Sequence, residues 1–441
     1  IYAYTDGTED INELQKLNIV NPEVYINPDT GLAYIGLLKS ITSEEVTVEL
    51  ENVDGNLISM TASGKVTVGH DFFGNYSKTV VTSDYEIFKG QARIDSAITD
   101  TLFFGIDGAS SQTKSKVKYE YDEKNMVSSA NDLPIGVVRN SNGMITGFSE
   151  ESQDKIQGSV TIGSDIFGNS YSTIVIHSTE ENIDNYQYQI IYGQTKIEYA
   201  TTRTVSQGVD GVISEAINKV RYEYTNGNER ARDLPDNIIN GERYINPETG
   251  RAYLGLLKSI TPLEVTASDY NGDSYSYQGI ITVTHDIFDN YSTTLSGNTY
   301  LIINGEAKAE SSYTITHSHK TDGSRSLSLG WLKYTYNSDT ARLREIKKTQ
   351  LSPEQFALLR EYALSINNPE ITAVLSRVNY DEINGITLGS DTFGNSYITL
   401  EQSRYLNPEE WDGKVLVDWT SATTTSVNID GSINITVNKL R

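Results

Sequence analysis

The chain has 441 residues, room for about three average domains, and 37% of them are apolar, a fraction that is typical of globular proteins and argues against wholesale disorder. The absence of cysteine excludes disulfides, thiolate catalysis and zinc sites built on thiolates. A formal net charge of −24 argues against nucleic acid and anionic lipid as partners, and no apolar run reaches the roughly 18 residues that a membrane-spanning helix needs.

The chain opens with an extended run that contains a Tyr-x-Tyr pair, Tyr2 and Tyr4. The same pair recurs three times, always at one distance behind an Asp-Gly dipeptide, which is a strong signal for a hairpin turn. These copies lie at 107–121, 210–224 and 322–336. A fourth Asp-Gly, at 430–431, is followed by a strand-like run up to Arg441 without the pair. We therefore expect residues 1–5 and the run that ends at Arg441 to be two pieces of one kind of strand.

A second signature, Asp-x-Phe-Gly-Asn or a close variant, predicts a turn between two strands in each of four modules. It begins at Asp71, Asp165, Asp286 and Asp391. The flanking residues alternate between two kinds, which indicates an A-B-A-B order with a super-repeat of about 220 residues. We interpret the phenylalanine of each turn as a core residue.

The predicted fold is all-β, with four tandem antiparallel β-sandwich-like modules. The modules are expected at 1–117, 118–220, 221–332 and 333–441, with the N-terminal strand 1–5 completing a neighbouring module. One segment departs from the strand pattern, because Ser352, Pro353 and Gln355 have the N-cap, first-position proline and capping-box pattern of a helix. We predict a helix over 353–365 and a second one around 370–377, which together form a small helical insertion at about 353–377.

Two groups of residues are candidates for metal binding. Asp269, Asn271 and Asp273 place short oxygen-bearing side chains in one loop, a composition that suits Ca²⁺, and Ca²⁺ is the one cofactor that we retain as a candidate. His317 and His319 share one face of a strand, as two ligands of a metal would. We interpret this pair as a solvated strand face, because no other module repeats it.

Catalytic chemistry is not predicted. The sequence contains no Gly-x-Ser-x-Gly elbow, and the adjacent residues His70 and Asp71 would point to opposite faces of a strand. The 29 tyrosines recur mostly at equivalent positions of the modules, so we interpret them as strand formers and cross-strand partners rather than as a sugar-binding platform. We therefore do not expect an enzyme.

The Tyr-x-Tyr pairs at 119–121 and 222–224 and the four Asp-x-Phe turns resemble the YD (Rhs-type) repeats of bacterial surface and toxin-delivery proteins, with a longer spacing here. In architecture and composition the chain resembles the tandem β-repeat fibres and adhesins of bacterial surfaces. These resemblances imply a large extracellular structure rich in β-strands, either a shell or a fibre at the cell surface.

The leading hypothesis is a structural subunit or repeat segment of an extracellular filament or surface appendage. Copies of the chain would join head-to-tail by β-strand complementation, as processed subunits or as repeats of one very long chain. The predicted assembly residues are Ile1, Tyr2, Ala3, Tyr4, Thr5, Ile433, Ile435, Val437 and Leu440. The alternative is a modular adhesin that binds a carbohydrate on a host cell, or a glycan-active enzyme, with one pocket built from unrepeated residues. Candidates for that pocket are His317, Trp331, Trp411 and Trp419.

Overall fold

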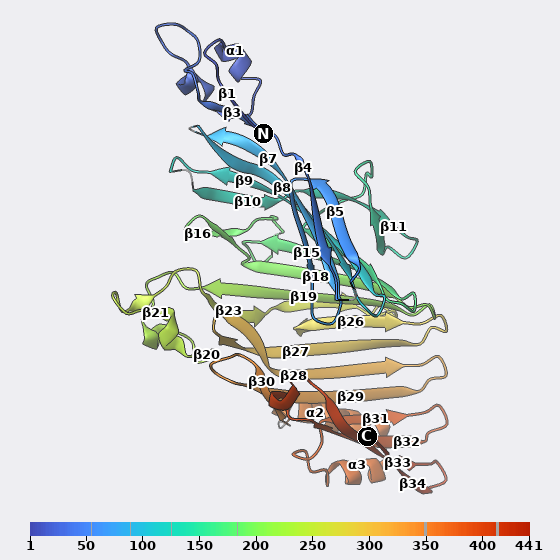
Figure 1. The fold of residues 1–441 in the computed structure, drawn as a ribbon. Coiled ribbons are helices and arrows are strands. Elements are labelled where there is room, and N and C mark those ends of the chain that lie inside the picture. The colour runs from blue at the N-terminus through green and yellow to red at the C-terminus, as the bar shows by residue number, and fades with distance from the viewer. Residues whose placement is uncertain (54, 89, 125, 183, 348–350, 412–413) are drawn as a thin grey trace. The chain divides into compact units, whose positions relative to one another are not determined.

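The computed structural model describes residues 1–53, 55–88, 90–124, 126–182, 184–347, 351–411 and 414–441. The chain divides into two compact units, an N-terminal unit, Ile1–Val209, and a C-terminal unit, Asp210–Arg441. Most of the regular structure in both units is β-strand, so the all-β prediction is confirmed (Figure 1). The division into four modules stays a prediction.

The N-terminal unit has two short helical turns, α1 (Ile11–Leu14) and the 3₁₀ helix η1 (Pro22–Tyr25). Its strands are β1 (Tyr2–Tyr4), β2 (Ile19–Val20), β3 (Leu38–Ile41), β4 (Glu45–Glu51), β5 (Leu57–Ser63), β6 (Lys65–His70), β7 (Tyr76–Phe88), β8 (Gln91–Phe104), β9 (Ser110–Tyr121), β10 (Val127–Asp132), β11 (Pro134–Arg139), β12 (Ile145–Phe148), β13 (Lys155–Gln157), β14 (Ser159–Ser164), β15 (Ser170–Ser178), β16 (Gln189–Ile191), β17 (Gln194–Lys196) and β18 (Tyr199–Gln207).

The main sheet of the N-terminal unit is an antiparallel meander in which β6, β7, β8 and β9 pair in sequence order. Strand β9 then divides its partners. Residues 110–114 pair with β14, whereas residues 117–121 pair with the short strand β10. The meander continues through β15 and β18. The predicted module boundary at 117/118 therefore falls inside one strand, and the sheet runs across it.

The C-terminal unit has the helices α2 (Pro353–Ile366) and α3 (Pro369–Leu375) and the 3₁₀ helices η2 (Ala231–Asp233), η3 (Gly241–Tyr244) and η4 (Pro408–Trp411). Its strands are β19 (Ile213–Tyr224), β20 (Ile238–Ile239), β21 (Ile245–Asn246), β22 (Arg251–Ala252), β23 (Leu257–Pro262), β24 (Glu264–Ser268), β25 (Ser274–Gln278), β26 (Ile280–His285), β27 (Tyr291–Ile303), β28 (Glu306–His319), β29 (Arg325–Tyr336), β30 (Leu343–Lys347), β31 (Gly385–Ser390), β32 (Ser396–Tyr405), β33 (Val417–Val427) and β34 (Ile433–Leu440).

The main sheet of the C-terminal unit follows the same plan. Strand β19 pairs with β26, and β26, β27, β28 and β29 then pair in order. Strand β29 again divides its partners between β31 and β30, and the sheet continues through β32, β33 and β34. The predicted boundaries at 220/221 and 332/333 also fall inside strands, β19 and β29.

The helical insertion is confirmed. Helix α2 begins at an N-cap, Ser352, whose hydroxyl accepts the N–H of Gln355, and the Gln355 side chain closes the capping box. Leu359 on α2 and Ile371 on α3 are fully buried and belong to one core cluster with the sheet residues Leu388 and Ile398. The side of α2 that carries Leu359 is therefore packed on the sheet.

The four Asp-x-Phe turns differ from our interpretation, because their rings are exposed. Phe73, Phe167, Phe288 and Phe393 are 54%, 73%, 69% and 76% exposed. Each turn is closed by polar groups instead. In the first, Oδ1 of Asp71 accepts the N–H groups of Phe73 and Asn75 at 2.9 and 3.0 Å, and the other three turns repeat this pattern. The interpretation of these phenylalanines as core residues is wrong, because the aspartate holds the turn without a packed ring.

Candidate functional site

One edge of the long strand β19 pairs with two different strands. Residues 213–218 pair with β26, and residues 220–224 pair with β23. In the first half Ile217 lies opposite Ile281, which is 0% exposed, and the hydroxyls of Ser214 and Thr284 are 2.5 Å apart. This half of β19 therefore fills the edge of β26 and helps to bury its apolar side chains.

Strand β34 has the sequence pattern of the first half of β19. Both strands follow an Asp-Gly turn, and β34 matches β19 in an initial isoleucine and a later Asn-Lys pair, Asn438 and Lys439. Within the described residues β34 pairs with β33 alone, between Ile433 and Leu440. We define the open edge of β34 as the edge that faces away from β33.

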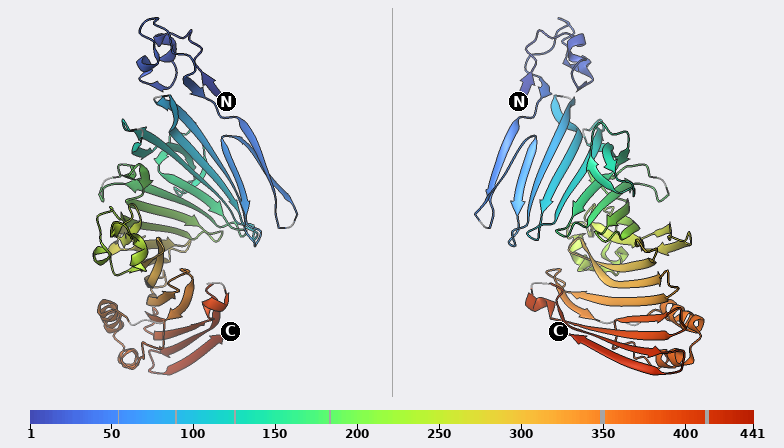
Figure 2. Two further views of the ribbon diagram at one scale, coloured as in Figure 1. Left: turned by 60° about the vertical axis from the view of Figure 1, so that its left-hand side comes forward. Right: turned by 90° about the vertical axis from the view of Figure 1, so that its right-hand side faces the viewer.

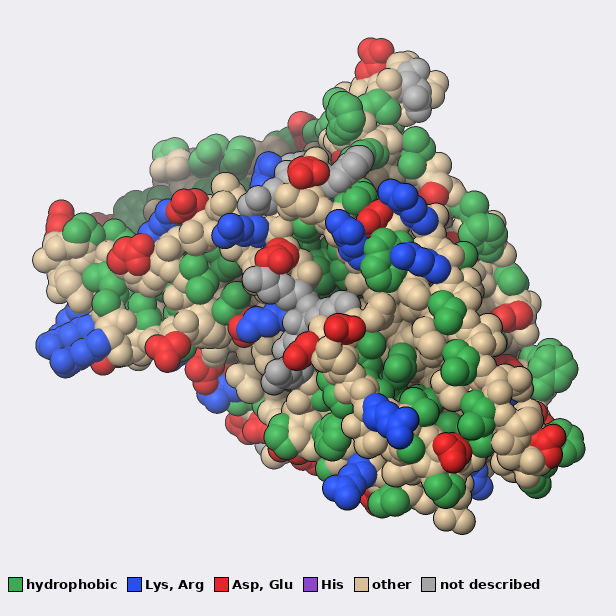
Figure 3. Space-filling view, turned by 90° about the horizontal axis from the view of Figure 1, so that it is seen from below, with side chains coloured by type: hydrophobic (Ala, Val, Ile, Leu, Met, Phe, Trp, Pro, Cys, Tyr) green, Lys and Arg blue, Asp and Glu red, His purple; other side chains and the backbone are tan. Residues whose placement is uncertain are grey.

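The side chains of β34 are exposed along its whole length. Ile433 is 51% exposed, Ile435 is 69% exposed, and Val437 and Leu440 are each 64% exposed. Figure 3 views the protein from below Figure 1, which is the side where Figure 1 draws β34. Hydrophobic side chains lie at this surface among charged ones. An apolar strand with an open edge is a template for pairing with another strand.

The counterpart of β26 in the N-terminal unit is β6. It pairs with β7 as β26 pairs with β27, and both strands end in a histidine, His70 and His285. Among the described residues no strand pairs with β6 along its other edge, which is the edge where β26 pairs with β19. We define this edge as the open edge of β6. Val66 on β6 is half-buried, whereas Ile281 at the same place on β26 is fully buried.

Strand β1 corresponds to the second half of β19, and it is paired within its own chain. Tyr2 and Tyr4 lie opposite Ile41 and Leu38 of β3, with a bulge between Ala3 and Tyr4. Residues 222–224 have the same register and bulge on β23. The pairing with β3 uses one edge of β1, and completion of a neighbouring module by residues 1–5 stays a prediction.

Thr5 fixes the end of β1. It is 3% exposed, and its hydroxyl donates to the carbonyl of Tyr34 at 2.5 Å and accepts the N–H of Leu37 at 2.9 Å. Thr225 in the C-terminal unit repeats both bonds, with Tyr253 and Leu256, at the same distances. The predicted assembly residues Tyr2 to Thr5 are therefore anchored in their own unit.

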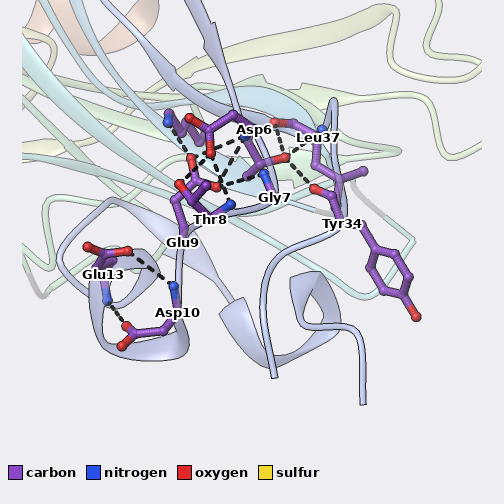
Figure 4. Close-up of polar contacts among 10 residues, drawn as sticks. Asp6, Gly7, Thr8, Glu9, Asp10, Glu13, Tyr34 and Leu37 are labelled. Carbon is purple, nitrogen blue, oxygen red and sulfur yellow. Dashed lines mark hydrogen bonds and ion pairs between the residues drawn. The ribbon is translucent and has the colours of Figure 1, made fainter. Parts of the chain in front are cut away.

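A carboxylate completes this anchor. Glu9 accepts the N–H groups of Asp6 and Gly7 at 3.2 Å and forms an ion pair with Lys39. Figure 4 shows the Glu9 side chain turned toward Asp6 and Gly7. Lys39 holds the pKa of the Glu9 carboxyl below its ordinary value although burial opposes this, and Glu9 raises the pKa of Lys39. Sequence reasoning missed this anchor. The available signal was a threonine followed four residues later by a glutamate, which recurs at 225 and 229.

Hydroxyl groups form a regular row across each sheet, with one threonine or serine on most strands. In the N-terminal unit the directly opposed residues are Thr67, Thr79, Thr101, Thr113, Thr161, Thr173 and Thr204. In the C-terminal unit they are Thr282, Thr294, Thr316, Ser328, Thr387, Thr399, Thr424 and Thr436. The hydroxyls of alternate neighbours, such as Thr79 and Thr101, are hydrogen-bonded at 2.8 to 3.0 Å. We call these the threonine rows.

The calcium candidate is a closed hairpin turn between β24 and β25. Oδ1 of Asp269 accepts the N–H groups of Asn271 and Asp273, each at 2.9 Å, and its Oδ2 accepts the hydroxyl of Tyr275 at 3.3 Å. The amide of Asn271 donates to the hydroxyl of Tyr291. The carboxylate of Asp269 is thus occupied by donors of the protein, and Ca²⁺ binding at Asp269, Asn271 and Asp273 stays a prediction.

The residues of the alternative hypothesis are not gathered around one hollow. Trp331 lines a cavity of about 530 Å³ with Tyr277 and Tyr313, whereas Trp419 lines a different cavity of about 660 Å³. The side chain of Trp411 lies outside the part that the structure describes. His317 packs near the ring of Tyr275, and burial lowers its pKa. The described residues contain no group of three or more histidines and carboxylates placed to hold a metal ion.

In the described parts of the chain, no helix is both long enough and apolar enough to cross a membrane.

The sequence was compared with protein families and with curated proteins. No protein-family model matches this sequence, and no curated protein is similar to it.

Proposed function

We propose that this protein is a structural subunit of an extracellular filament or surface appendage. Copies join head-to-tail when the open edge of β34 in one copy pairs with the open edge of β6 in the next. If the sequence belongs to a longer repeat chain, the same pairing joins its consecutive segments. The extracellular location rests on the resemblance to bacterial surface repeats.

One observation carries the proposal: the chain already makes this contact once, between β19 and β26. Strand β34 has the pattern of the donor, β6 has the pattern of the acceptor, and each is unpaired on the relevant edge within the described residues. Exposed edges of this kind are usually protected by charge, bulges or proline, because they otherwise pair with other chains. The apolar side chains Ile435 and Val437 provide none of this protection.

The contact is heterologous, since the donor and acceptor edges are different surfaces. A heterologous contact leaves one unused donor and one unused acceptor after each addition, so it builds open filaments unless its rotation closes a ring. The two unused edges remain whatever the number of copies already joined. Blocking either edge in every copy should therefore stop growth.

Two charged variants test the proposal in sedimentation-velocity experiments. Val437→Glu blocks the donor edge and Val66→Glu blocks the acceptor edge, because a carboxylate would be placed among apolar partners without a counter-charge. We expect each variant alone to be monomeric, whereas an equimolar mixture forms dimers and nothing larger, since each variant supplies the intact edge that the other lacks.

The matched control is Ile429→Glu, which makes the same charge change at the tip of the β33–β34 hairpin, where the side chain is 77% exposed. It should assemble as the unchanged chain does. Assembly of Val437→Glu into the same large species as the unchanged chain would contradict the proposal, and so would an unchanged chain that stays monomeric at high concentration.

A further inference from the structure

The hairpin of β4 and β5 lies beside β6, at the open edge of the acceptor strand (Figure 2). Its counterpart in the C-terminal unit is the hairpin of β24 and β25, and β24 contacts both β26 and β19. The two hairpins differ in burial. Val265 on β24 is 6% exposed, whereas Val46, at the same place on β4, is 41% exposed. The side of β4 that would meet a strand equivalent to β19 is therefore uncovered.

Resting on the proposed assembly, we infer that β34 of a second copy binds alongside β6 in the register of β19 on β26, and that the β4–β5 hairpin packs against it. The residue pairs are Ile433↔His70, Asn434↔Gly69, Ile435↔Val68, Thr436↔Thr67, Val437↔Val66 and Asn438↔Lys65. The hairpin thus acts as a clasp that covers the incoming strand.

The threonine rows support this register independently of the β19 comparison. One row reaches the open edge of β6 at Thr67, and the other reaches the open edge of β34 at Thr436. The inferred register places Thr436 directly opposite Thr67, so the rows of two copies join without a break. A slip by one residue would move every side chain of β34 to the other face of the sheet.

Side chains also match along the inferred contact. Ile435 and Val437 lie opposite Val68 and Val66, and aliphatic pairs of this kind stabilise antiparallel strands. In the C-terminal unit, just after the residues of β19 that pair with β26, the carbonyl of Lys219 accepts the N–H of Leu263. The residue equivalent to Leu263 in the N-terminal unit is Glu44. The same geometry brings the basic Lys439 of the donor next to Glu44 of the acceptor.

Cysteine pairs test the register, because the chain contains no cysteine of its own. Val437→Cys or Thr436→Cys is placed in one chain, and Val66→Cys or Thr67→Cys is placed in another. The chains are mixed and oxidised mildly. We expect one of the two matched pairs to crosslink at least about tenfold faster than the shifted pair Val437→Cys with Val68→Cys, because directly opposed Cβ atoms are roughly 5 Å apart and diagonal ones roughly 7–8 Å.

The outcomes separate the register from the assembly itself. Preferential crosslinking of the shifted pair, or equal rates, overturns the register while light scattering still shows assembled chains. Assembly without any crosslink overturns the β34–β6 contact. Absence of assembly in the unchanged chain overturns the proposed function as well. A chain that carries both Val437→Cys and Val66→Cys and closes only on itself shows that the partner is not a second copy.

Alkylation tests the clasp. A single cysteine, Val46→Cys, should react with a maleimide about tenfold more slowly when about nine in ten chains are associated, because only unassociated chains expose it. The control is Leu57→Cys at the far end of the same hairpin, where the side chain is 63% exposed. It should react at one rate in both states. Equal protection of both cysteines, or of neither, would overturn the clasp.

Discussion

Thr5 and Thr225 perform one task in the two units, because each ties the end of a strand to a loop through a buried hydroxyl. Thr225 is 0% exposed, and its hydroxyl is the acceptor of the Leu256 N–H. If the hydroxyl is removed, this N–H is left without its partner in a place that water does not reach. Unsatisfied buried groups are costly, so a single hydroxyl has a measurable effect on a large unit.

Thr225→Val should lower the free energy of unfolding of the C-terminal unit by about 1–3 kcal/mol. Urea unfolding followed by tryptophan fluorescence measures this unit specifically, because all three tryptophans lie in it. Thr249→Val is the control, since Thr249 is exposed and water can replace its bond; its effect should stay within about 0.5 kcal/mol. Equal effects of the two substitutions would contradict the role of Thr225.

The Glu9 anchor should weaken in acid. The pKa of Glu9 is lower in the folded protein than its ordinary value, so its contribution to stability is complete above the ordinary value and is lost as the pH falls through the folded one. The pKa of Lys39 is raised, so its contribution is lost only as the pH rises through that raised value. Glu9→Gln should remove the acid-dependent part.

Hydrogen exchange of residues 1–40 measures this effect when the two proteins are compared at the same pH. The Glu9→Gln protein should exchange faster than the unchanged protein at neutral pH, and the difference should shrink as the pH falls below the ordinary range of a glutamate. Glu49→Gln, on an exposed strand position, is the control and should show no difference. A difference for Glu9→Gln that is constant with pH would contradict the ionic role.

At the scale of the element, the hairpin of β31 and β32 contains two large apolar residues, of which one is buried in the core and the other is exposed. Phe393 at its turn is 76% exposed, whereas Ile398 on β32 is 0% exposed and belongs to the core cluster of the C-terminal unit. Both are large apolar side chains a few positions apart. Their surroundings decide their effect on stability.

Ile398→Ala should lower the free energy of unfolding of the C-terminal unit by about 2–5 kcal/mol, because it leaves a cavity in the core. Phe393→Ala should change it by no more than about 0.5 kcal/mol, because an exposed ring loses little packing. Both are measured by urea unfolding with tryptophan fluorescence. A loss at Phe393 as large as that at Ile398 would show that the turn aromatic is a core residue after all.

Local patterns predicted the elements that local forces determine. The helical insertion followed from the capping residues at Ser352 and Gln355, and the strands and turns followed from the Asp-Gly and Asp-x-Phe signatures. The exposure of Phe393 could not be predicted, because hydrophobicity alone does not say whether a second layer covers a turn. The short helix α1 was also missed, although Asp10 and Glu13 carry a capping box.

The pairing of strands lies beyond local patterns for a different reason. Strands β9, β19 and β29 each divide their length between two partners that are far apart in the sequence. The repeated spacing indicated that each run was one strand, but it did not indicate which half met which partner. Module boundaries placed inside these strands were the consequence. For the same reason the sequence did not indicate that β3 pairs with residues 2–4.

For the whole molecule, one chain contains both β34 and β6, the strands proposed as donor and acceptor, and within the described residues each pairs with another strand along one edge only. The internal pair β19 and β26 provides the geometry of the missing contact. The proposed assembly therefore requires no surface that the protein does not already use once inside a single copy.

Negative-stain electron microscopy of the purified, unmodified chain over a range of concentrations tests this assembly most directly. We predict unbranched filaments, with an axial repeat that corresponds to one chain or to its half-length repeat, and we predict that they are absent from preparations of Val437→Glu. Particles that remain separate at every concentration, or filaments that Val437→Glu forms equally well, would contradict it.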